Sequence, residues 1–321
     1  MTPRVAGRDR IFIAQSARAE SVAYVALAAA VALLSLDVHA QQLEPRSYSN
    51  IPIGMNFLVS GYVHTDGSIG TDAASPLQDA EVHTDNALIG YARSFGLWGT
   101  SGKFDIIGGQ SWVSGSATFL GQPRARKVNG LIDPQFRVAI NLYGAPAMRL
   151  SEFTNYQQNI IVGMSLAVTA PLGAYEDDKL LNIGNNRWSF KPELGVSKAF
   201  GRFTLELAPG VTIFTDNEHY FNNTRREQDP VFSGQAHGIY SFRRGYWGAV
   251  SATYYSGGDS TLNGIRQDDR QENVRIGGTL TIPLVKHPSV KLYGSTGVWS
   301  RSGSDFWLAG IAFQYRWGGG L

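Results

Sequence analysis

The chain has 321 residues, and its 28 basic and 26 acidic residues leave a formal net charge of only +2. This balance does not indicate a nucleic-acid-binding surface. The absence of cysteine excludes disulfide bonds, thiolate zinc sites and cysteine nucleophiles. Thirty-seven glycines, frequent aromatic residues and only 17% charged residues are typical of a chain built from many strands and turns.

Residues 1–40 have the three parts of an export signal. Basic residues from Arg4 onward precede the apolar run Val22–Leu36, and the small residue Ala40 follows. A single membrane anchor is the alternative, but about fifteen apolar residues are few for a helix that crosses a bilayer. We therefore predict a signal peptide that is cleaved after Ala40, followed by a polar periplasmic lead-in over residues 41–51.

Twelve strands are predicted after the lead-in. The pattern is clearest at 186–196, where bulky apolar residues such as Trp188 and Leu194 alternate with charged residues such as Lys191 and Glu193. A period of two indicates a strand, because successive side chains leave it on opposite faces. The predicted strands lie near 52–64, 86–95, 103–117, 135–143, 159–170, 187–198, 203–213, 231–242, 246–255, 273–283, 289–299 and 305–317.

The connections between these strands alternate in length. Long ones are predicted near 65–85, 118–129, 171–186, 214–230 and 256–272, with shorter ones between them, and only 144–158 and 302–304 depart from the rule. Outer-membrane barrels join their strands by short periplasmic turns and long outer loops, whereas a soluble β-sandwich has no reason to do so. We therefore predict an all-β fold, a transmembrane, antiparallel, up-and-down β-barrel of about 12 strands over residues 52–317, with a C-terminal tail at 318–321.

Several motifs resemble the family of outer-membrane proteins named for the MetA-pathway of phenol degradation, whose members are often labelled transporters. The motifs are Leu131–Phe136, Asn141–Ala147, Asn182–Glu193, Gln228–Pro230 and Gln314–Trp317. One departure is Ile132, where the family pattern has a glycine before the Asp-Pro pair. The resemblance implies an outer-membrane β-barrel that takes up aromatic or other small apolar compounds.

Polar side chains on the inward strand faces are expected to line the barrel. A two-residue turn at Phe200-Gly201 would make Glu193 and Glu206 diagonal neighbours that need nearby cations. These side chains form either a charged constriction that selects solutes or an internal salt-bridge network that fills the lumen. The pore-lining candidates are Arg137, Asn141, Arg187, Lys191, Glu193, Glu206, Gln235, His237 and Arg275.

Two loop motifs have possible binding or catalytic interpretations. Arg124, Arg126 and Lys127 fall in a predicted outer loop, where they either pair with lipopolysaccharide phosphates or are simply solvated. The segment 258–262 (GDSTL) superficially resembles the nucleophile block of the GDSL esterases, but a threonine separates its serine from its leucine. The C-terminal Asp-x-x-His of that family is also missing, so a glycine-rich outer loop is the better interpretation.

The favoured hypothesis is a passive channel in the bacterial outer membrane for small molecules, including aromatic or apolar compounds such as phenolics. It predicts no enzyme activity and no cofactor. The histidines show no metal-ligand spacing, and no metal is expected. The expected partners are outer-membrane lipid and lipopolysaccharide, a small-molecule permeant and the barrel-assembly machinery, and no nucleic acid. The alternatives are an outer-membrane enzyme that acts on lipids and a structural barrel whose lumen is plugged.

Overall fold

The computed structural model describes residues 44–321 except 71–76, 120, 244, 285–286 and 301–302. The predicted signal peptide therefore lies outside the described residues, as does the start of the lead-in. The described chain is almost entirely β-structure, and none of its helices is long and apolar enough to cross a membrane.

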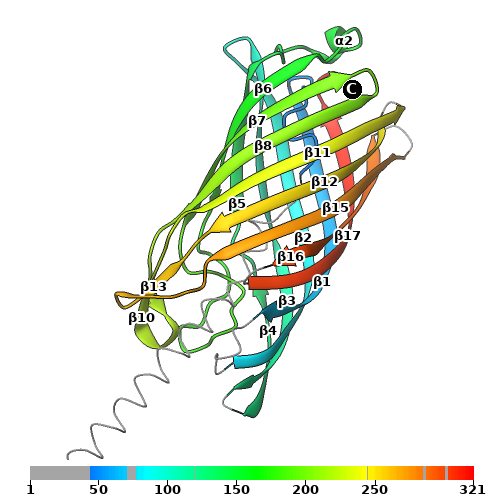
Figure 1. The fold of residues 1–321 in the computed structure, drawn as a ribbon. Helices are drawn as coiled ribbons and strands as arrows, with labels where there is room; N and C mark the ends of the chain where they lie inside the picture. Colours follow the sequence, from blue (N-terminus) through cyan, green and yellow to red (C-terminus); the bar gives the residue numbers. More distant parts are fainter. Residues whose placement is uncertain (1–43, 71–76, 120, 244, 285–286, 301–302) are drawn as a thin grey trace, which may run out of the picture.

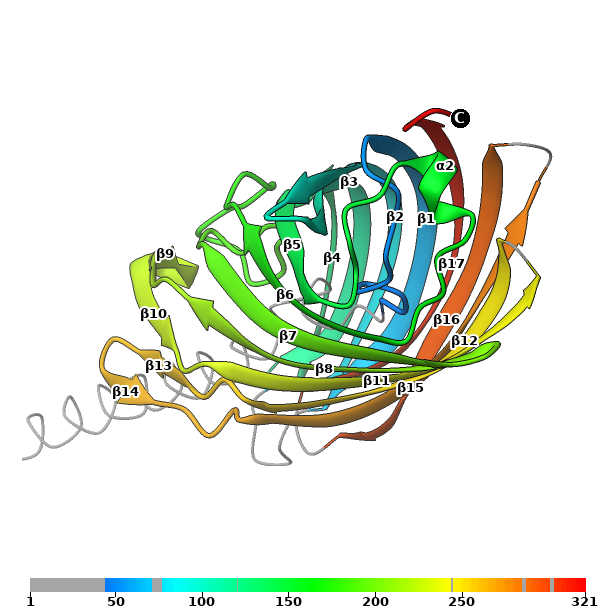
Figure 2. The same cartoon turned by 90° about the horizontal axis from the view of Figure 1, so that it is seen from above.

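The described strands form a closed antiparallel barrel with twelve wall strands (Figures 1 and 2). Each wall strand pairs with its neighbours in chain order, and the last pairs with the first, from Met55 opposite Gly318 to Gly70 opposite Gly303. The wall strands are β1 (Met55–Gly70), β2 (Leu77–Leu97), β3 (Thr100–Phe119), β5 (Gln135–Tyr143), β6 (Ile160–Thr169), β7 (Ser189–Phe200), β8 (Phe203–Phe214), β11 (Val231–Arg243), β12 (Tyr246–Gly257), β15 (Gln271–Pro283), β16 (Pro288–Ser300) and β17 (Gly303–Gly318). All twelve predicted strands are confirmed.

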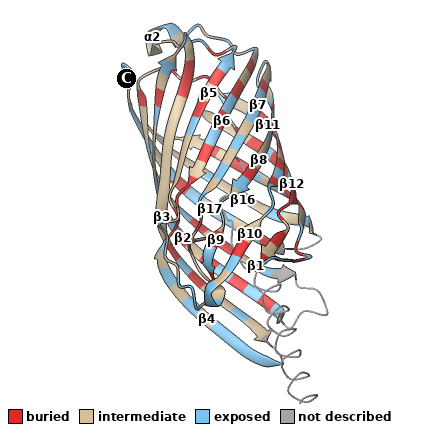
Figure 3. Cartoon of the chain, turned by 90° about the vertical axis from the view of Figure 1, so that its left-hand side faces the viewer, coloured by how far each residue is buried: buried red, intermediate tan, exposed pale blue. Residues whose placement is uncertain are grey.

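The alternation in the sequence separates an outer apolar face from an inner polar face. Buried and exposed positions alternate along the strands (Figure 3). On β7 and β8, Leu194 is 57% exposed on the outside, whereas Glu206 is 1% exposed on the inside. An isolated charge would not be buried so deeply without partners, so the inner face must supply hydrogen bonds and counter-charges.

Both the start of β1 and the end of β17 lie at the end of the barrel that carries the short turns, which we call the turn end (Figure 1). The connection 144–158, which was predicted to break the alternation of short and long connections, also lies at the turn end and contains the short helix α2 (Leu150–Phe153). The long connections lie at the opposite loop end. Two of them form a small sheet of β9 (Asn217–Tyr220), β10 (Thr224–Gln228), β13 (Ser260–Leu262) and β14 (Ile265–Arg266), with the 3-10 turn η1 (Phe221–Asn223).

Two of the predicted long loops, 65–85 and 118–129, are wrong. Strands β1 to β3 continue into these segments, and an additional strand, β4 (Gln122–Leu131), pairs with the distal half of β3. This hairpin extends beyond the rest of the barrel (Figure 1). None of the residues of β4 is buried, so the apolar–polar alternation on which strand prediction depends is absent from this strand. After a break at Ile132–Pro134, β5 pairs with the proximal half of β3.

The turn between β7 and β8 differs from the predicted one by one position. Phe200 pairs with Phe203, so the turn residues are Gly201 and Arg202, and Gly201 adopts the positive φ of 64° that this tight turn requires. The resulting register places Glu206 opposite Ser197 and Glu193 opposite Gly210. Glu193 and Glu206 are therefore not the diagonal neighbours that the sequence predicted, although both point inward.

Candidate functional site

Residues 44–54, which we call the inner plug, run through the barrel before β1 begins (Figure 2). The last part of the inner plug is fixed to the turn end by backbone hydrogen bonds. Gly54 N donates to Ser94 O over 3.0 Å, and Ile53 N donates to Met148 O over 2.9 Å. The first part is held instead by side chains of the barrel wall, so the two parts depend on different interactions.

Tyr48 of the inner plug sits in a recess made by two glycines. Gly163 on β6 and Gly195 on β7 are opposite each other, and a Cβ added at Gly195 would lie 2.0 Å from Tyr48 Cε2. The ring can come this close to the wall only because neither position carries a side chain. Tyr48 is 1% exposed, and its hydroxyl donates to Glu193 Oε1 over 2.9 Å.

Glu44, the first described residue of the inner plug, forms an ion pair with Arg137, which also binds Asp105 over 3.1 Å. Burial acts to raise the pKa of Glu44, but the opposing charges of Arg137 and Lys103 outweigh it and lower the pKa to about 2. The carboxylate is therefore ionised near neutral pH. Further along the inner plug, Ser47 N donates to Glu206 Oε1 over 3.0 Å.

Six of the nine pore-lining candidates gather around this part of the inner plug. They line a small cavity of about 30 Å³, which we call the charged constriction, together with Glu44 and Ser47. Lys191 and Glu193 are 3.1 Å apart there. Sequence alternation was sufficient to find these residues because they come from neighbouring strands of one wall. The six are Arg137, Lys191, Glu193, Glu206, Gln235 and His237.

The other three candidates lie inside the barrel but away from the charged constriction. Asn141 donates to Ser101 Oγ over 2.9 Å. Arg187 donates to Gln228 Oε1 over 2.5 Å toward the loop end, and its guanidinium lies over the Phe214 ring. Arg275 lies over the Phe306 ring, with 3.6 Å to the ring centroid, and donates to Ser295 Oγ.

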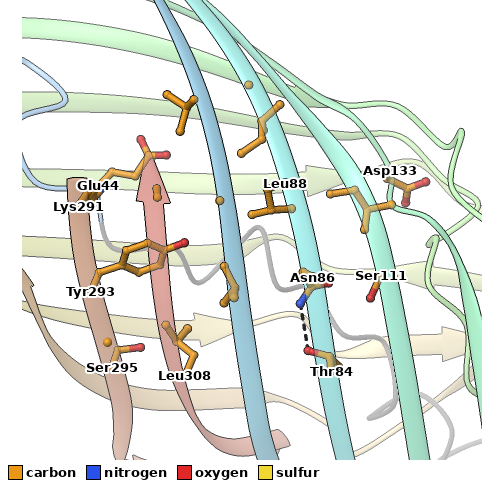
Figure 4. Close-up of a pocket in the computed structure, with 18 of the residues that line it drawn as sticks. Glu44, Thr84, Asn86, Leu88, Ser111, Asp133, Lys291, Tyr293, Ser295 and Leu308 are labelled. Atoms are coloured by element: carbon orange, nitrogen blue, oxygen red, sulfur yellow. Dashed lines mark hydrogen bonds between the residues drawn. The ribbon is translucent and has the colours of Figure 1, made fainter. Parts of the chain in front are cut away.

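A larger cavity of about 240 Å³, which we call the chamber, lies on the opposite wall, and Glu44 lines both cavities. Its lining is mainly apolar, but Lys291 and Tyr293 of β16 face it (Figure 4). Among the polar residues of the lining, Asn86 Nδ2 donates a hydrogen bond to Thr84 Oγ1 over 3.1 Å. The apolar lining includes Val59, Val63, Leu88, Ile107, Ile132, Ile183, Leu308 and Ala312.

Residues 171–186, which we call the outer lid, contribute Asn182, Ile183 and Asn185 to the lining of the chamber. Asp133, at the break between β4 and β5, accepts hydrogen bonds from Gly173 N and Asn185 N, each over 2.7 Å. Leu181 packs against the inner faces of β2 and β3. Asp133 was noted in the sequence only as part of a motif, and its role as the anchor of the outer lid becomes visible only in the structure.

Three residues of the site were not among the candidates from the sequence, and they differ in the sequence signal that they carry. Lys291 lies on the polar face of its predicted strand, so the alternation could have identified it. Glu44 and Tyr48 belong to a lead-in with no periodicity, and nothing in its pattern indicates that it enters the barrel.

The structure also shows where the basic motif at 124–127 and the GDSTL segment lie. Arg124, Arg126 and Lys127 are on β4 rather than in a loop, and Arg126 pairs with Glu176 of the outer lid over 2.8 Å. Ser260 of the GDSTL segment is fully buried, and its hydroxyl donates to Asp269 over 2.5 Å. In the part of the chain that the structure describes, no group of three or more histidine and acidic residues is arranged to hold a metal ion.

Comparisons with known proteins support the architecture. A family model described as "Putative MetA-pathway of phenol degradation" matches residues 56–317. A solved outer membrane channel from Pseudomonas putida F1 is similar at 19% identity and a TM-score of 0.72, over 86% of this chain and 100% of that one. The transport unit of the autotransporter AIDA-I from Escherichia coli shares 9% identity at a TM-score of 0.47, over 90% and 97% of the two chains. No curated protein sequence matches. The likeness to the Pseudomonas putida channel shows the barrel fold.

Proposed function

The chain belongs to the MetA-pathway of phenol degradation family, whose model covers the whole barrel, and from this premise we propose that it is an outer-membrane channel for passive uptake of small molecules. The permeants in this proposal are aromatic or apolar compounds such as phenolics. The observation that carries it is the chamber, because an apolar cavity between an outer lid and an inner plug is suited to holding a permeant in transit. The proposal includes no covalent chemistry.

The size and lining of the chamber support a one-ring permeant. Engineered apolar cavities of about 150 Å³ bind benzene, and the chamber is about 240 Å³. Apolar side chains such as Leu88 and Leu308 suit the ring, and Tyr293 offers a polar group. The shared fold with a protein described as an outer membrane channel adds to this support.

The other assignments of the proposal follow from an outer-membrane location. Residues 1–40 would be a signal peptide, and the barrel over 52–317 would be inserted by the barrel-assembly machinery. The described residues 44–51 of the predicted periplasmic lead-in belong to the inner plug and contact the inner barrel wall, so this part of the lead-in would lie in the lumen rather than in the periplasm. The turn end would face the periplasm, since short turns lie on that side. Arg124 and Lys127 on the β4 extension are then the better candidates for lipopolysaccharide contact, because Arg126 is paired with the outer lid.

Filling the chamber is expected to block uptake. Ala312 of β17 is buried and lines the chamber, whereas Ala309 on the same strand is exposed on the outer face. We expect Ala312→Phe to reduce the uptake of phenol by cells that depend on this protein at least about tenfold, because the ring occupies the space of the permeant. Ala309→Phe should retain wild-type uptake, and equal uptake by the two variants would contradict the proposal.

Single-channel recording of the refolded mature protein in a planar bilayer tests whether a pore exists. Discrete openings are expected, with an ion selectivity set by the charged constriction. Lys191→Glu should raise cation preference and Glu193→Lys should raise anion preference, each about fivefold, as about 1 kcal/mol of charge–charge energy in a wet lumen implies. A silent bilayer from correctly folded protein would contradict an aqueous pore.

A structural barrel with a plugged lumen is the second candidate, and the contacts of the inner plug favour it. If those contacts serve only stability, reversing the charge of Glu193 or Glu206 should lower the thermal stability and leave permeability unchanged. A change in permeability would exclude this alternative.

A further inference from the structure

We propose that Glu44 is a tethered counter-ion that the permeant replaces, so that the chamber selects small aromatic molecules carrying one anionic oxygen group, such as a carboxylate. This inference rests on the proposed uptake function and adds both a substrate class and a way to release the inner plug. It starts from the position of Glu44, which is the residue of the inner plug that lines both the chamber and the charged constriction.

The surroundings of Glu44 carry an excess of positive charge. Arg137, Lys103 and Lys291 all act on the Glu44 carboxylate. Asp105 lies 3.1 Å from Arg137 and 3.8 Å from Lys103. Of the other two carboxylates in the charged constriction, Glu193 is paired with Lys191 over 3.1 Å, and Arg46 acts on Glu206. Beyond these two matched pairs, three cations face the two carboxylates Glu44 and Asp105, and a low-dielectric wall on the other side strengthens their combined field. An anion that enters the chamber is attracted to this place.

Lys291 is the cation left over from these pairings. It faces the chamber beside Glu44 (Figure 4), and no carboxylate lies at ion-pair distance from it in the described part of the chain. Its ammonium lies 5.4 Å from the centroid of the Tyr293 ring. A bound carboxylate could accept hydrogen bonds from this ammonium and from the Tyr293 hydroxyl while its ring contacts Leu308 and Leu88.

Exchange of one carboxylate for another makes release of the inner plug feasible. Removing Glu44 alone would leave Arg137 with Asp105 as its remaining ion-pair partner and would take a negative charge away from buried cations, which is unfavourable. An incoming carboxylate beside Lys291 supplies a negative charge in place of Glu44, so the local charge balance is kept. Glu44 then moves out of its site, and the nearby hydrogen bond from Ser47 N to Glu206 breaks as the first part of the inner plug moves. The backbone hydrogen bonds near Gly54 keep the last part of the inner plug attached to the barrel.

The experiment uses benzoate and its neutral counterpart benzyl alcohol as probes of the refolded mature protein. Binding is measured by titration calorimetry, and plug release by the labelling rate of Ser47→Cys with a charged thiol reagent, which is specific because the chain has no cysteine. We expect benzoate to bind about tenfold more tightly than benzyl alcohol and to accelerate labelling. Lys291→Met should remove most of that preference, with Lys291→Gln as a second variant if Met impairs folding. Lys179→Met, which removes a charge from the exposed part of the outer lid, should keep it.

The outcomes separate this inference from the proposed function. Equal binding of both probes, with discrete channel openings still present, would overturn the anion preference and leave the uptake function standing. Preferred binding of benzoate without faster labelling of Ser47→Cys would overturn the release of the inner plug. Failure of both probes to bind, together with a silent bilayer, would overturn the proposed function itself.

Discussion

Replacing Asp133 by alanine is expected to detach the outer lid and lower its local stability by about 3 kcal/mol. The Asp133 side chain is 2% exposed and accepts hydrogen bonds from Gly173 N and Asn185 N. Each such bond to a charged group contributes about 1.5–3 kcal/mol. Trypsin cleavage after Lys179, which lies in the outer lid, should therefore be about a hundredfold faster in Asp133→Ala, since cleavage follows the population of the opened segment.

The matched control for Asp133→Ala is Asp177→Ala. Asp177 also belongs to the outer lid, but its side chain is exposed, and its contact with Asn222 is made by its backbone carbonyl. The control should be cleaved at the wild-type rate. If Asp133→Ala resisted trypsin as well as the control does, Asp133 would not be the anchor of the outer lid.

Replacing Gly195 by valine is expected to expel Tyr48 and open the barrel. A Cβ at this position would overlap the Tyr48 ring, at 2.0 Å from Cε2. The burial of the ring, about 1.5–3 kcal/mol, and its hydrogen bond to Glu193 would both be lost. Because each 1.4 kcal/mol changes a population about tenfold, the open probability in planar bilayers should rise at least about tenfold.

Gly234→Val is the control for Gly195→Val. Gly234 also lies within a strand, but a Cβ added there has nothing within 4 Å, and its cross-strand partner Tyr254 is on the outer face. Valine is compatible with strands, so both variants should fold and show the heat-dependent gel shift of a barrel. A wild-type open probability in folded Gly195→Val would contradict the role of Tyr48 in closing the lumen.

The sequence by itself determined the wall of the barrel. The period of two at 187–198 and 203–213 identified β7 and β8, and it sorted Leu194 to the outside and Glu206 to the inside. This succeeds because a membrane-spanning strand meets lipid on one face and a polar interior on the other, so its position is encoded locally. For the same reason, six of the nine pore-lining candidates lie around one cavity.

Tertiary structure alone decided which segments occupy the lumen. Residues 44–54 have no periodicity, and their path is set by partners far away in the sequence, with Tyr48 fitting against Gly163 and Gly195 and Glu44 against Arg137. Likewise, Asp133 acts only because the outer lid folds back over it. Alternation reports which face a residue takes, but it carries no information about which distant segment that face will meet. The wall of this protein was therefore predictable from sequence, whereas its inner plug, outer lid and chamber were not.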